Sequence, residues 1–192
     1  MTKSRKAAFL DRDGTIIRQV ELLVDLKKVK LLPGAAQAIK ALNEMGFLVV
    51  VVTNQPVVAR GLITQAGIRR MNRFIARQLL SRGARIDAFY FCPHHPHATL
   101  KRYRRRCSCR KPGAGMIRKA MRRYGIRARQ SFMVGDGIID VVAGKRAGVK
   151  TILVKSGPGH RRLDTLYDAK PDFISKDLFG AVRVIRAQTR KK

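Results

Sequence analysis

The sequence has no tryptophan, only three cysteines among its 192 residues, and few acidic residues. Three cysteines cannot all pair, and all of them lie within residues 92–109, so the disulfide framework of a small secreted protein is excluded. No apolar run is long enough to span a bilayer, and the N-terminal segment lacks the apolar core and cleavage site of a signal peptide. The sequence therefore predicts a soluble, cytoplasmic protein without a membrane-embedded segment.

The shortage of acidic residues leaves a large positive charge. Lys and Arg number 42 against 12 Asp and Glu, a formal net charge of +30. Such a surface attracts polyanions whatever the fold. It is either an electrostatic footprint for nucleic acid or anionic substrates, including non-specific nucleic-acid binding, or a compositional bias or engineered surface without such a function. Only residues 101–106 and the C-terminal tail are concentrated basic runs, and the even spread of the other basic residues favours a compositional bias.

The order of apolar segments predicts an α/β fold. Short apolar runs alternate with segments of helical periodicity, which begin near Pro33 and Thr64 among other positions. This alternation implies a Rossmann-like, mainly parallel sheet with helices on both faces. We expect a single domain over residues 1–192, with a basic tail at about 187–192. Strands are expected within residues 7–12, 47–55, 86–92, 131–136, 150–155 and 171–176, and helices within 32–46, 64–83, 113–125, 138–148 and 178–188.

Acidic residues follow two of the predicted strands, at the edge where open α/β sheets bind ligands. Asp11 and Asp13 come after the first strand, and Asp136 and Asp140 after the fourth. A lone Asp-Gly pair is usually a turn, but several converging carboxylates repel one another unless a cation neutralises them. Oxygen ligands of this kind suit Mg²⁺. The groups that would complete a site for phosphoryl transfer are the Thr53 hydroxyl and the Lys111 ammonium.

The stretch CPHHPHATLKRYRRRCSCRKP, residues 92–112, contains every cysteine and three of the four histidines. The pairs Cys92-x-His94 and Cys107-x-Cys109 together offer three thiolates and one imidazole. This set suits tetrahedral Zn²⁺, and free thiols are the alternative. Because protein would fill all four positions, such a zinc ion would be structural and would hold the loop in place. The expected ligands are Cys92, His94, Cys107 and Cys109, whereas His95 and His97 are expected to be solvated loop residues.

Four motifs, FLDRDGT, VVTNQ, CRKP and VGDGIID, resemble those of the haloacid dehalogenase-like phosphatases and stand in the family's order. The resemblance covers residues from about 8 to about 180, and the Asp-x-Asp-Gly-Thr motif after a hydrophobic strand is highly specific. The two cysteine clusters are similar to those of the zinc-containing branch, which includes heptose bisphosphate 7-phosphatases and histidinol phosphatases.

The resemblance implies a role for each site residue. Asp11 would be the nucleophile that forms an aspartyl-phosphate. Asp13 would protonate the leaving oxygen and then activate water. The phosphate-binding residues would be Thr53, Asn54, Arg110 and Lys111, the Mg²⁺ ligands would be Asp11, the backbone carbonyl of Asp13 and Asp136, and Asp140 would support Asp136 and its loop.

The short segments between the motifs predict an enzyme without a cap domain and with an open site. The long loop between the two cysteine clusters, and ARG at residues 59–61, are similar to the heptose type. We therefore expect a monomeric enzyme that removes the 7-phosphate of D-glycero-D-manno-heptose 1,7-bisphosphate. Three departures from that type concern substrate recognition: residues 17–25, PVV at 56–58, and Gly137.

Other functions stay open. One is a histidinol phosphatase. Another is a phosphatase that acts on nucleic-acid ends, which the charge favours but the scarcity of aromatic residues for base stacking does not. A last one is a non-catalytic polyanion-binding protein on a phosphatase fold, against which the complete set of catalytic residues argues.

Overall fold

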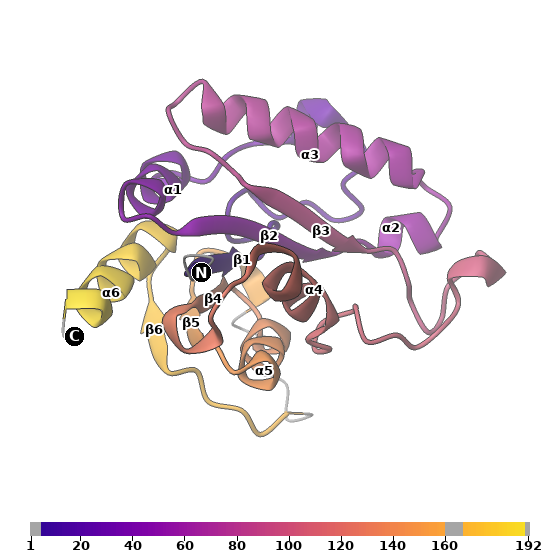
Figure 1. Ribbon diagram of the computed structural model, residues 1–192. Coiled ribbons are helices and arrows are strands. Elements are labelled where there is room, and N and C mark those ends of the chain that lie inside the picture. The colour runs from indigo at the N-terminus through magenta and orange to yellow at the C-terminus, as the bar shows by residue number, and fades with distance from the viewer. Residues whose placement is uncertain (1–4, 160–166, 191–192) are drawn as a thin grey trace.

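A six-stranded parallel β-sheet forms the centre of the molecule (Figure 1). The structure is a computed structural model that describes residues 5–159 and 167–190. The strands lie in the order β3-β2-β1-β4-β5-β6, and every neighbouring pair is parallel. The predicted strands are confirmed, each inside its expected segment. They are β1 (Ala7–Leu10), β2 (Leu48–Asn54), β3 (Ala88–Cys92), β4 (Phe132–Gly135), β5 (Lys150–Val154) and β6 (Phe173–Ser175).

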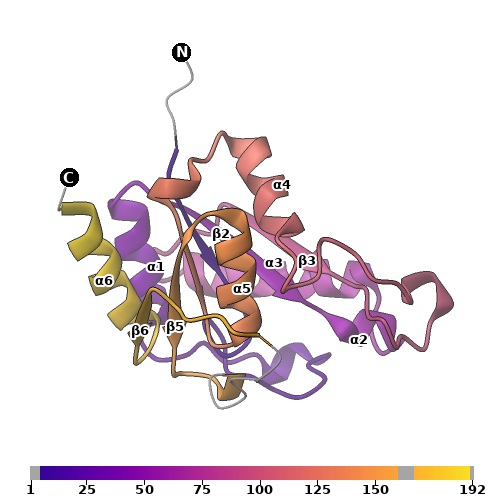
Figure 2. The ribbon, with the colours of Figure 1, turned by 90° about the horizontal axis from the view of Figure 1, so that it is seen from below.

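Helices cover both faces of the sheet, as the sequence predicts. Seen from below in Figure 2, two helices lie in front of the sheet, and the other three pack on its far face. The near pair is α4 (Gly115–Tyr124) and α5 (Ile138–Ala147), and the far group is α1 (Ala35–Glu44), α3 (Gln65–Leu80) and α6 (Leu178–Arg190). Short 3-10 helices occupy Leu26–Lys28, Lys101–Tyr103 and Ala128–Gln130.

The pleat of the strands divides the core between the two faces. In β1, Ala8 and Leu10 pack in the cluster formed with α1, α3 and α6. Ala7 and Phe9 point the other way and pack with α4 and α5. All four side chains are fully buried, which explains why the strand is a continuous apolar run in the sequence.

Local signals set the ends of the helices. The Thr64 hydroxyl accepts a hydrogen bond from the Gly67 N–H at 3.1 Å, so the predicted N-cap of α3 is confirmed. The short helix α2 (Pro56–Ala59) was not predicted, because four residues with two valines carry no helical period. Helix α6 continues to Arg190, so the described part of the expected basic tail is helical, and residues 191–192 lie outside the described residues.

The parallel register places the motif residues at one edge. Leu10 of β1 pairs with Val51 of β2 and with Val134 of β4, so the chain segments after these three strands emerge side by side. The cysteine loop, residues 92–112, starts from the end of β3 at the same edge. Among the described residues no inserted domain covers this edge, in agreement with the prediction of a capless enzyme. No described helix has the length and hydrophobicity needed to cross a membrane.

Candidate active site

The turn after β1 brings Asp11 close to the segment after β4. Gly14 has a φ of +78°, in the left-handed region that favours glycine. A Cβ atom at this position would lie 2.6 Å from Oδ2 of Asp136, which is closer than real side chains approach. The Asp-Gly pair of the first motif is therefore a turn and also a part of the site, because only glycine lets the chain pass so near to Asp136.

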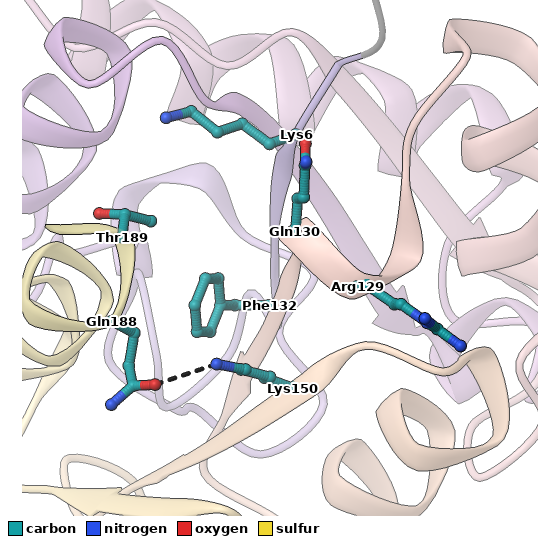
Figure 3. A pocket seen from close by; sticks show the side chains of 7 residues that line it. All are labelled: Lys6, Arg129, Gln130, Phe132, Lys150, Gln188 and Thr189. Atoms are coloured by element: carbon teal, nitrogen blue, oxygen red, sulfur yellow. Dashed lines mark hydrogen bonds between the residues drawn. The ribbon is translucent and has the colours of Figure 1, made fainter. Parts of the chain in front are cut away.

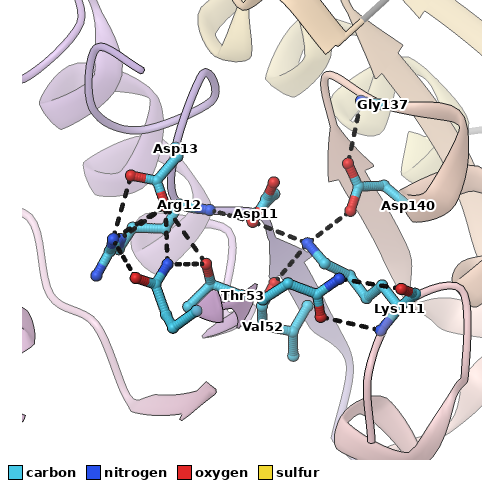
Figure 4. Close-up of polar contacts among 10 residues, drawn as sticks. Asp11, Arg12, Asp13, Val52, Thr53, Lys111, Gly137 and Asp140 are labelled. Atoms are coloured by element: carbon cyan, nitrogen blue, oxygen red, sulfur yellow. Dashed lines mark hydrogen bonds and ion pairs between the residues drawn. The ribbon is translucent and has the colours of Figure 1, made fainter. Parts of the chain in front are cut away.

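Lys111 is the buried cation of the site (Figure 4). Its ammonium lies 2.8 Å from Oδ1 of Asp11 and 2.6 Å from Oδ1 of Asp140, and it donates a hydrogen bond to the Val52 carbonyl at 2.9 Å. Burial alone would lower the pKa of Lys111, but the two carboxylates outweigh it and raise that pKa. The lysine therefore remains protonated and fixes the position of Asp11.

The two oxygens of Asp11 differ in their contacts. Oδ1 accepts a hydrogen bond from the Arg12 N–H at 2.7 Å in addition to its ion pair with Lys111. Oδ2 has no hydrogen bond or ion pair with another described residue. One oxygen is thus held in place while the other stays available to a ligand.

Three carboxylates surround this one ammonium group. Ligand oxygens of Asp11, Asp136 and Asp140 lie within 4.8 Å of one another. Burial and the neighbouring carboxylates raise the pKa of Asp11 to about 7 despite Lys111, and burial together with Asp11 raises the pKa of Asp136 to about 6. The excess of negative charge over Lys111 suits a divalent cation with oxygen ligands.

Asp140 makes two fixed contacts within this group. Its Oδ2 accepts a hydrogen bond from the Gly137 N–H at 3.1 Å, and its Oδ1 pairs with Lys111. Asp136 has a separate partner, because its Oδ2 accepts a hydrogen bond from the Gly159 N–H at 2.8 Å. Asp140 therefore contacts both the Lys111 ammonium and the backbone of the 136–138 turn, and it fixes their positions relative to each other.

Asp13 points toward Arg12 and away from the Lys111 cluster (Figure 4). The Arg12 side chain is 1% exposed and donates from Nε to Oδ2 and from Nη2 to Oδ1 of Asp13, both at 3.1 Å. The Gln55 amide also donates to Oδ2 of Asp13, at 3.0 Å. The guanidinium is itself held by Oδ1 of Asn72 at 3.1 Å and Oε1 of Gln55 at 2.9 Å.

Arg12 and Asn72 were not predicted from the sequence, and Gln55 stood at an expected strand end without an assigned role. Arg12 and Gln55 lie inside two recognised motifs, so their polar side chains were an available signal. Asn72 occupies a buried position of α3 between Met71 and Ile75, and a polar residue on the apolar face of a predicted helix was a second signal.

The predicted phosphate-binding residues lie at this site, but two of them also have structural contacts. The Asn54 side chain forms a pair of 3.0 Å hydrogen bonds with the backbone of Lys111. The Thr53 hydroxyl accepts a hydrogen bond from Gln55 at 2.9 Å and lies 3.5 Å from Asp13. Arg110 donates to the His94 carbonyl at 3.1 Å. This contact links the start of the cysteine loop to an arginine that lines the active-site cavity.

The predicted catalytic and phosphate-binding residues line one cavity of about 410 Å³ at the carboxyl edge of the sheet. The other lining residues are Gln19, Pro56, Gly137, Ile138, Ile139 and Gly159. The members of the cavity that the sequence predicted are Asp11, Asp13, Thr53, Asn54, Arg110, Lys111, Asp136 and Asp140.

A smaller hollow, of about 210 Å³, lies beside Phe132, at the opposite end of β4 from Asp136 (Figure 3). Both of its lysines have partners, because the Lys150 ammonium donates to Gln188 at 2.9 Å and the Lys6 ammonium lies 4.5 Å from the centre of the Phe47 ring. No carboxylate of the described residues lines it. We therefore assign the candidate active site to the larger cavity.

The four predicted zinc ligands converge in the cysteine loop. Their sulfur and nitrogen atoms lie within 4.8 Å of one another, and the three sulfur atoms are separated by 3.0, 3.1 and 3.5 Å. His95 and His97 lie outside this cluster, and His97 is exposed. Three thiols and one imidazole nitrogen around a common centre form a site that one tetrahedral metal ion fits. The candidate ligands are Cys92, His94 through Nδ1, Cys107 and Cys109.

The chain is similar in sequence to known phosphatases. A family model described as haloacid dehalogenase (HAD) hydrolase-like matches residues 108–181. The chain is 42% identical to D-glycero-beta-D-manno-heptose-1,7-bisphosphate 7-phosphatase of Rhodopseudomonas palustris over 76% of this chain and 81% of the relative. It is 34% identical to the protein of the same name from Yersinia pestis, over 98% of this chain and 99% of that one.

Solved structures show the same similarity. D,D-heptose 1,7-bisphosphate phosphatase from B. bronchiseptica, crystallised with magnesium and phosphate, superposes with a TM-score of 0.82 and 32% identity, over 95% of this chain and 99% of that one. The corresponding enzyme from Burkholderia thailandensis gives a TM-score of 0.69 and 28% identity, over 95% and 99% of the two chains.

Proposed function

Because the chain belongs to the haloacid dehalogenase-like phosphatases, we propose that it removes the 7-phosphate of D-glycero-D-manno-heptose 1,7-bisphosphate through an aspartyl-phosphate intermediate. The similarity to heptose bisphosphate phosphatases over nearly the whole chain supports the substrate class. The observation that carries the chemistry is the asymmetry of Asp11, whose Oδ1 is held by Lys111 and the Arg12 N–H while Oδ2 has no partner among the described residues.

The first step would be attack by Oδ2 of Asp11 on phosphorus. A new O–P bond forms to Asp11, the bond from phosphorus to the sugar oxygen breaks, and the sugar oxygen takes a proton from Asp13. In the second step water attacks the phosphorus of the aspartyl-phosphate, Asp13 takes the proton of that water, and inorganic phosphate leaves. The Asp11 carboxylate is thereby regenerated.

The transferring phosphoryl group needs positive charge and hydrogen-bond donors around it. Lys111 supplies an ammonium beside Asp11, and Thr53 supplies a hydroxyl in the same cavity. Arg110 extends the positive charge to the rim, where it is held by the His94 carbonyl. These groups support binding of a phosphate ester and explain why several different side chains are required together.

A magnesium ion would be held by Asp11, the Asp13 backbone carbonyl and Asp136. The three-carboxylate cluster fits such an ion, because it has more negative charge than Lys111 can balance. When bound, the ion supplies charge neutralisation for the phosphoryl oxygens. Asp140 contributes by holding Lys111 and the 136–138 turn in place.

The cysteine loop would be held by a structural zinc ion on Cys92, His94, Cys107 and Cys109. The donor set and its tight grouping support zinc, and the thiols would remain reduced in the cytoplasm. Since Lys111 comes two residues after the last ligand, the loop also determines where the catalytic ammonium lies.

A panel of substrates tests this proposal. Magnesium-dependent phosphate release is measured from heptose 1,7-bisphosphate, histidinol phosphate and 5′-phosphorylated oligonucleotides, at low and at high salt. We expect the heptose bisphosphate to be hydrolysed fastest, with little effect of salt. Faster release from histidinol phosphate would contradict the substrate, and faster, salt-sensitive release from oligonucleotides would indicate an end-processing enzyme. Absence of release from every member would contradict the catalytic function itself.

A further inference from the structure

A basic groove runs along α4 on the face of the molecule that carries α4 and α5. It has a volume of about 630 Å³. One side of the groove is formed by the last part of the cysteine loop and the two residues that follow it before α4, and its other residues belong to the two helices. The residues that define the basic groove are Arg118, Lys119, Arg122 and Arg146, with Ser108 and Cys109 of the cysteine loop.

No negative charge opposes these cations. Between Asp87 and Asp136 the sequence holds thirteen Lys and Arg and no Asp or Glu. The four cationic side chains of the groove are exposed, and no carboxylate of the described residues lines it. The acid-free segment includes the cysteine loop and α4, and three of its basic residues, Arg118, Lys119 and Arg122, line the groove.

Hydrogen bonds orient the two outer guanidinium groups. Arg118 donates from Nη2 to the Arg146 carbonyl at 2.6 Å, and Arg146 donates from Nη1 to the Pro112 carbonyl at 3.1 Å. Their remaining N–H groups have no hydrogen-bond partner among the described residues and are available to an anion. Lys119 and Arg122 have no hydrogen bond or ion pair with the described residues, so no carboxylate in that part of the chain neutralises them.

The basic groove is separate from the active site. The segment from Ser108 to Gly115 stands between them, with Arg110 and Lys111 facing the catalytic cavity and Ser108 and Cys109 facing the groove. The two cavities share no lining residue. A ligand in the groove would therefore leave the sugar phosphate site free.

We propose that the basic groove binds the phosphate backbone of double-stranded nucleic acid without sequence preference. Guanidinium groups bind phosphate oxygens in pairs, and an open, arginine-lined groove without carboxylates suits a polymer that brings many phosphates. No aromatic side chain of the described residues lines the groove, so it offers no platform for stacking unpaired bases. Affinity then comes from backbone contacts and counterion release.

The test uses the full-length protein and a fluorescein-labelled 20-base-pair DNA duplex that has 5′-hydroxyl ends, so that it offers no terminal phosphate to the active site. Binding is measured by anisotropy from 50 to 300 mM salt for the wild type and for two double variants of equal charge. The groove variant is Lys119→Gln with Arg122→Gln. The control is Arg73→Gln with Arg77→Gln, which removes two exposed cations from α3 on the opposite face of the sheet.

We expect the groove variant to bind about tenfold more weakly at 0.1 M salt. The plot of log affinity against log salt should also be less steep, with the magnitude of its negative slope lower by about 2, or about one unit for each lost phosphate contact. The control should keep the wild-type slope, and both variants should keep wild-type phosphate release from the sugar substrate.

Equal losses of DNA affinity in both variants would mean that the whole surface attracts DNA. No loss in the groove variant would mean that the DNA binds elsewhere. Either result overturns the proposal. Displacement of the duplex by the sugar bisphosphate would overturn it as well, since the DNA would then occupy the active site. Loss of phosphate release in a separate wild-type assay contradicts the enzyme function and does not affect this test.

Discussion

Arg12 holds both carboxylate oxygens of Asp13, at 3.1 Å each, from a side chain that is 1% exposed. A buried guanidinium is stable only when its donors are paired, and Asn72 and Gln55 take the other two contacts. The carboxylate proposed as general acid is therefore oriented by a network that reaches into α3.

This network predicts a specific kinetic defect for Arg12→Met. General acid catalysis contributes roughly 10² to 10⁴ in rate when the leaving oxygen is basic. We expect turnover of an alkyl phosphate such as the heptose bisphosphate to fall by about 10² or more, while p-nitrophenyl phosphate, whose leaving group needs no proton, loses less than about tenfold. The measurement is the single-turnover rate of the first step for both substrates, because hydrolysis of the aspartyl-phosphate, in which Asp13 activates water, is common to the two. Equal losses on the two would mean that Arg12 serves only the fold, and Arg12→Lys, which cannot form the two-pronged contact, should resemble Arg12→Met.

Asp11→Asn tests the nucleophile. We expect phosphate release to disappear, because an amide cannot form the acyl-phosphate. The melting temperature without magnesium should not fall, since the change removes one of three crowded carboxylates and Lys111 keeps its pair with Asp140. Asp168→Asn, at an exposed position, is the matched control and should keep full activity. Near wild-type release by Asp11→Asn would exclude the aspartyl-phosphate route.

Lys111→Met should damage both stability and activity. It leaves Asp11 and Asp140 buried without their cation, a change that typically costs about 3–5 kcal/mol. Lys145→Met is the control, because it breaks an exposed ion pair with Asp172, a kind of contact worth about 1 kcal/mol or less. Urea unfolding of both variants gives the comparison. A loss for Lys111→Met no larger than that of the control would show that the buried ion pairs do not stabilise the fold.

Cys107→Ser tests the proposed zinc site of the cysteine loop, because it removes one of the four candidate ligands. We expect the zinc content to drop from one ion per chain, the melting temperature to fall, and phosphate release to decrease because Arg110 and Lys111 follow the ligand cluster directly. His97→Ala, outside the cluster and exposed, should change none of the three quantities. Zinc loss by a chelator with full retention of stability and activity would contradict the structural role.

The sequence was sufficient for the strands, the order of the elements and the edge at which the motifs meet. Continuous apolar runs such as VVVV can only be buried strands in this pattern, and parallel strands end at the same edge, so Asp11 and Asp136 had to lie near each other. Thr64 carried enough local information to place a helix start.

Side-chain partners across the fold could not be predicted in the same way. The contact between Arg12 and Asn72 spans sixty positions of the sequence and depends on how α3 lies over the end of β1. Asn54 was expected at the phosphate, and it does line the cavity, but its amide is taken up by the backbone of Lys111. Neither pairing leaves a local pattern, because each is set by packing between separate elements.

The three partners of the Lys111 ammonium also have a consequence for how the protein is made. Asp11, the Val52 carbonyl and Asp140 come from near the start, the first third and the last third of the chain. A ribosome-bound chain that lacks α5 contains Asp11 and Lys111 but not Asp140, so the set of partners around this lysine is complete only after α5 has been synthesised.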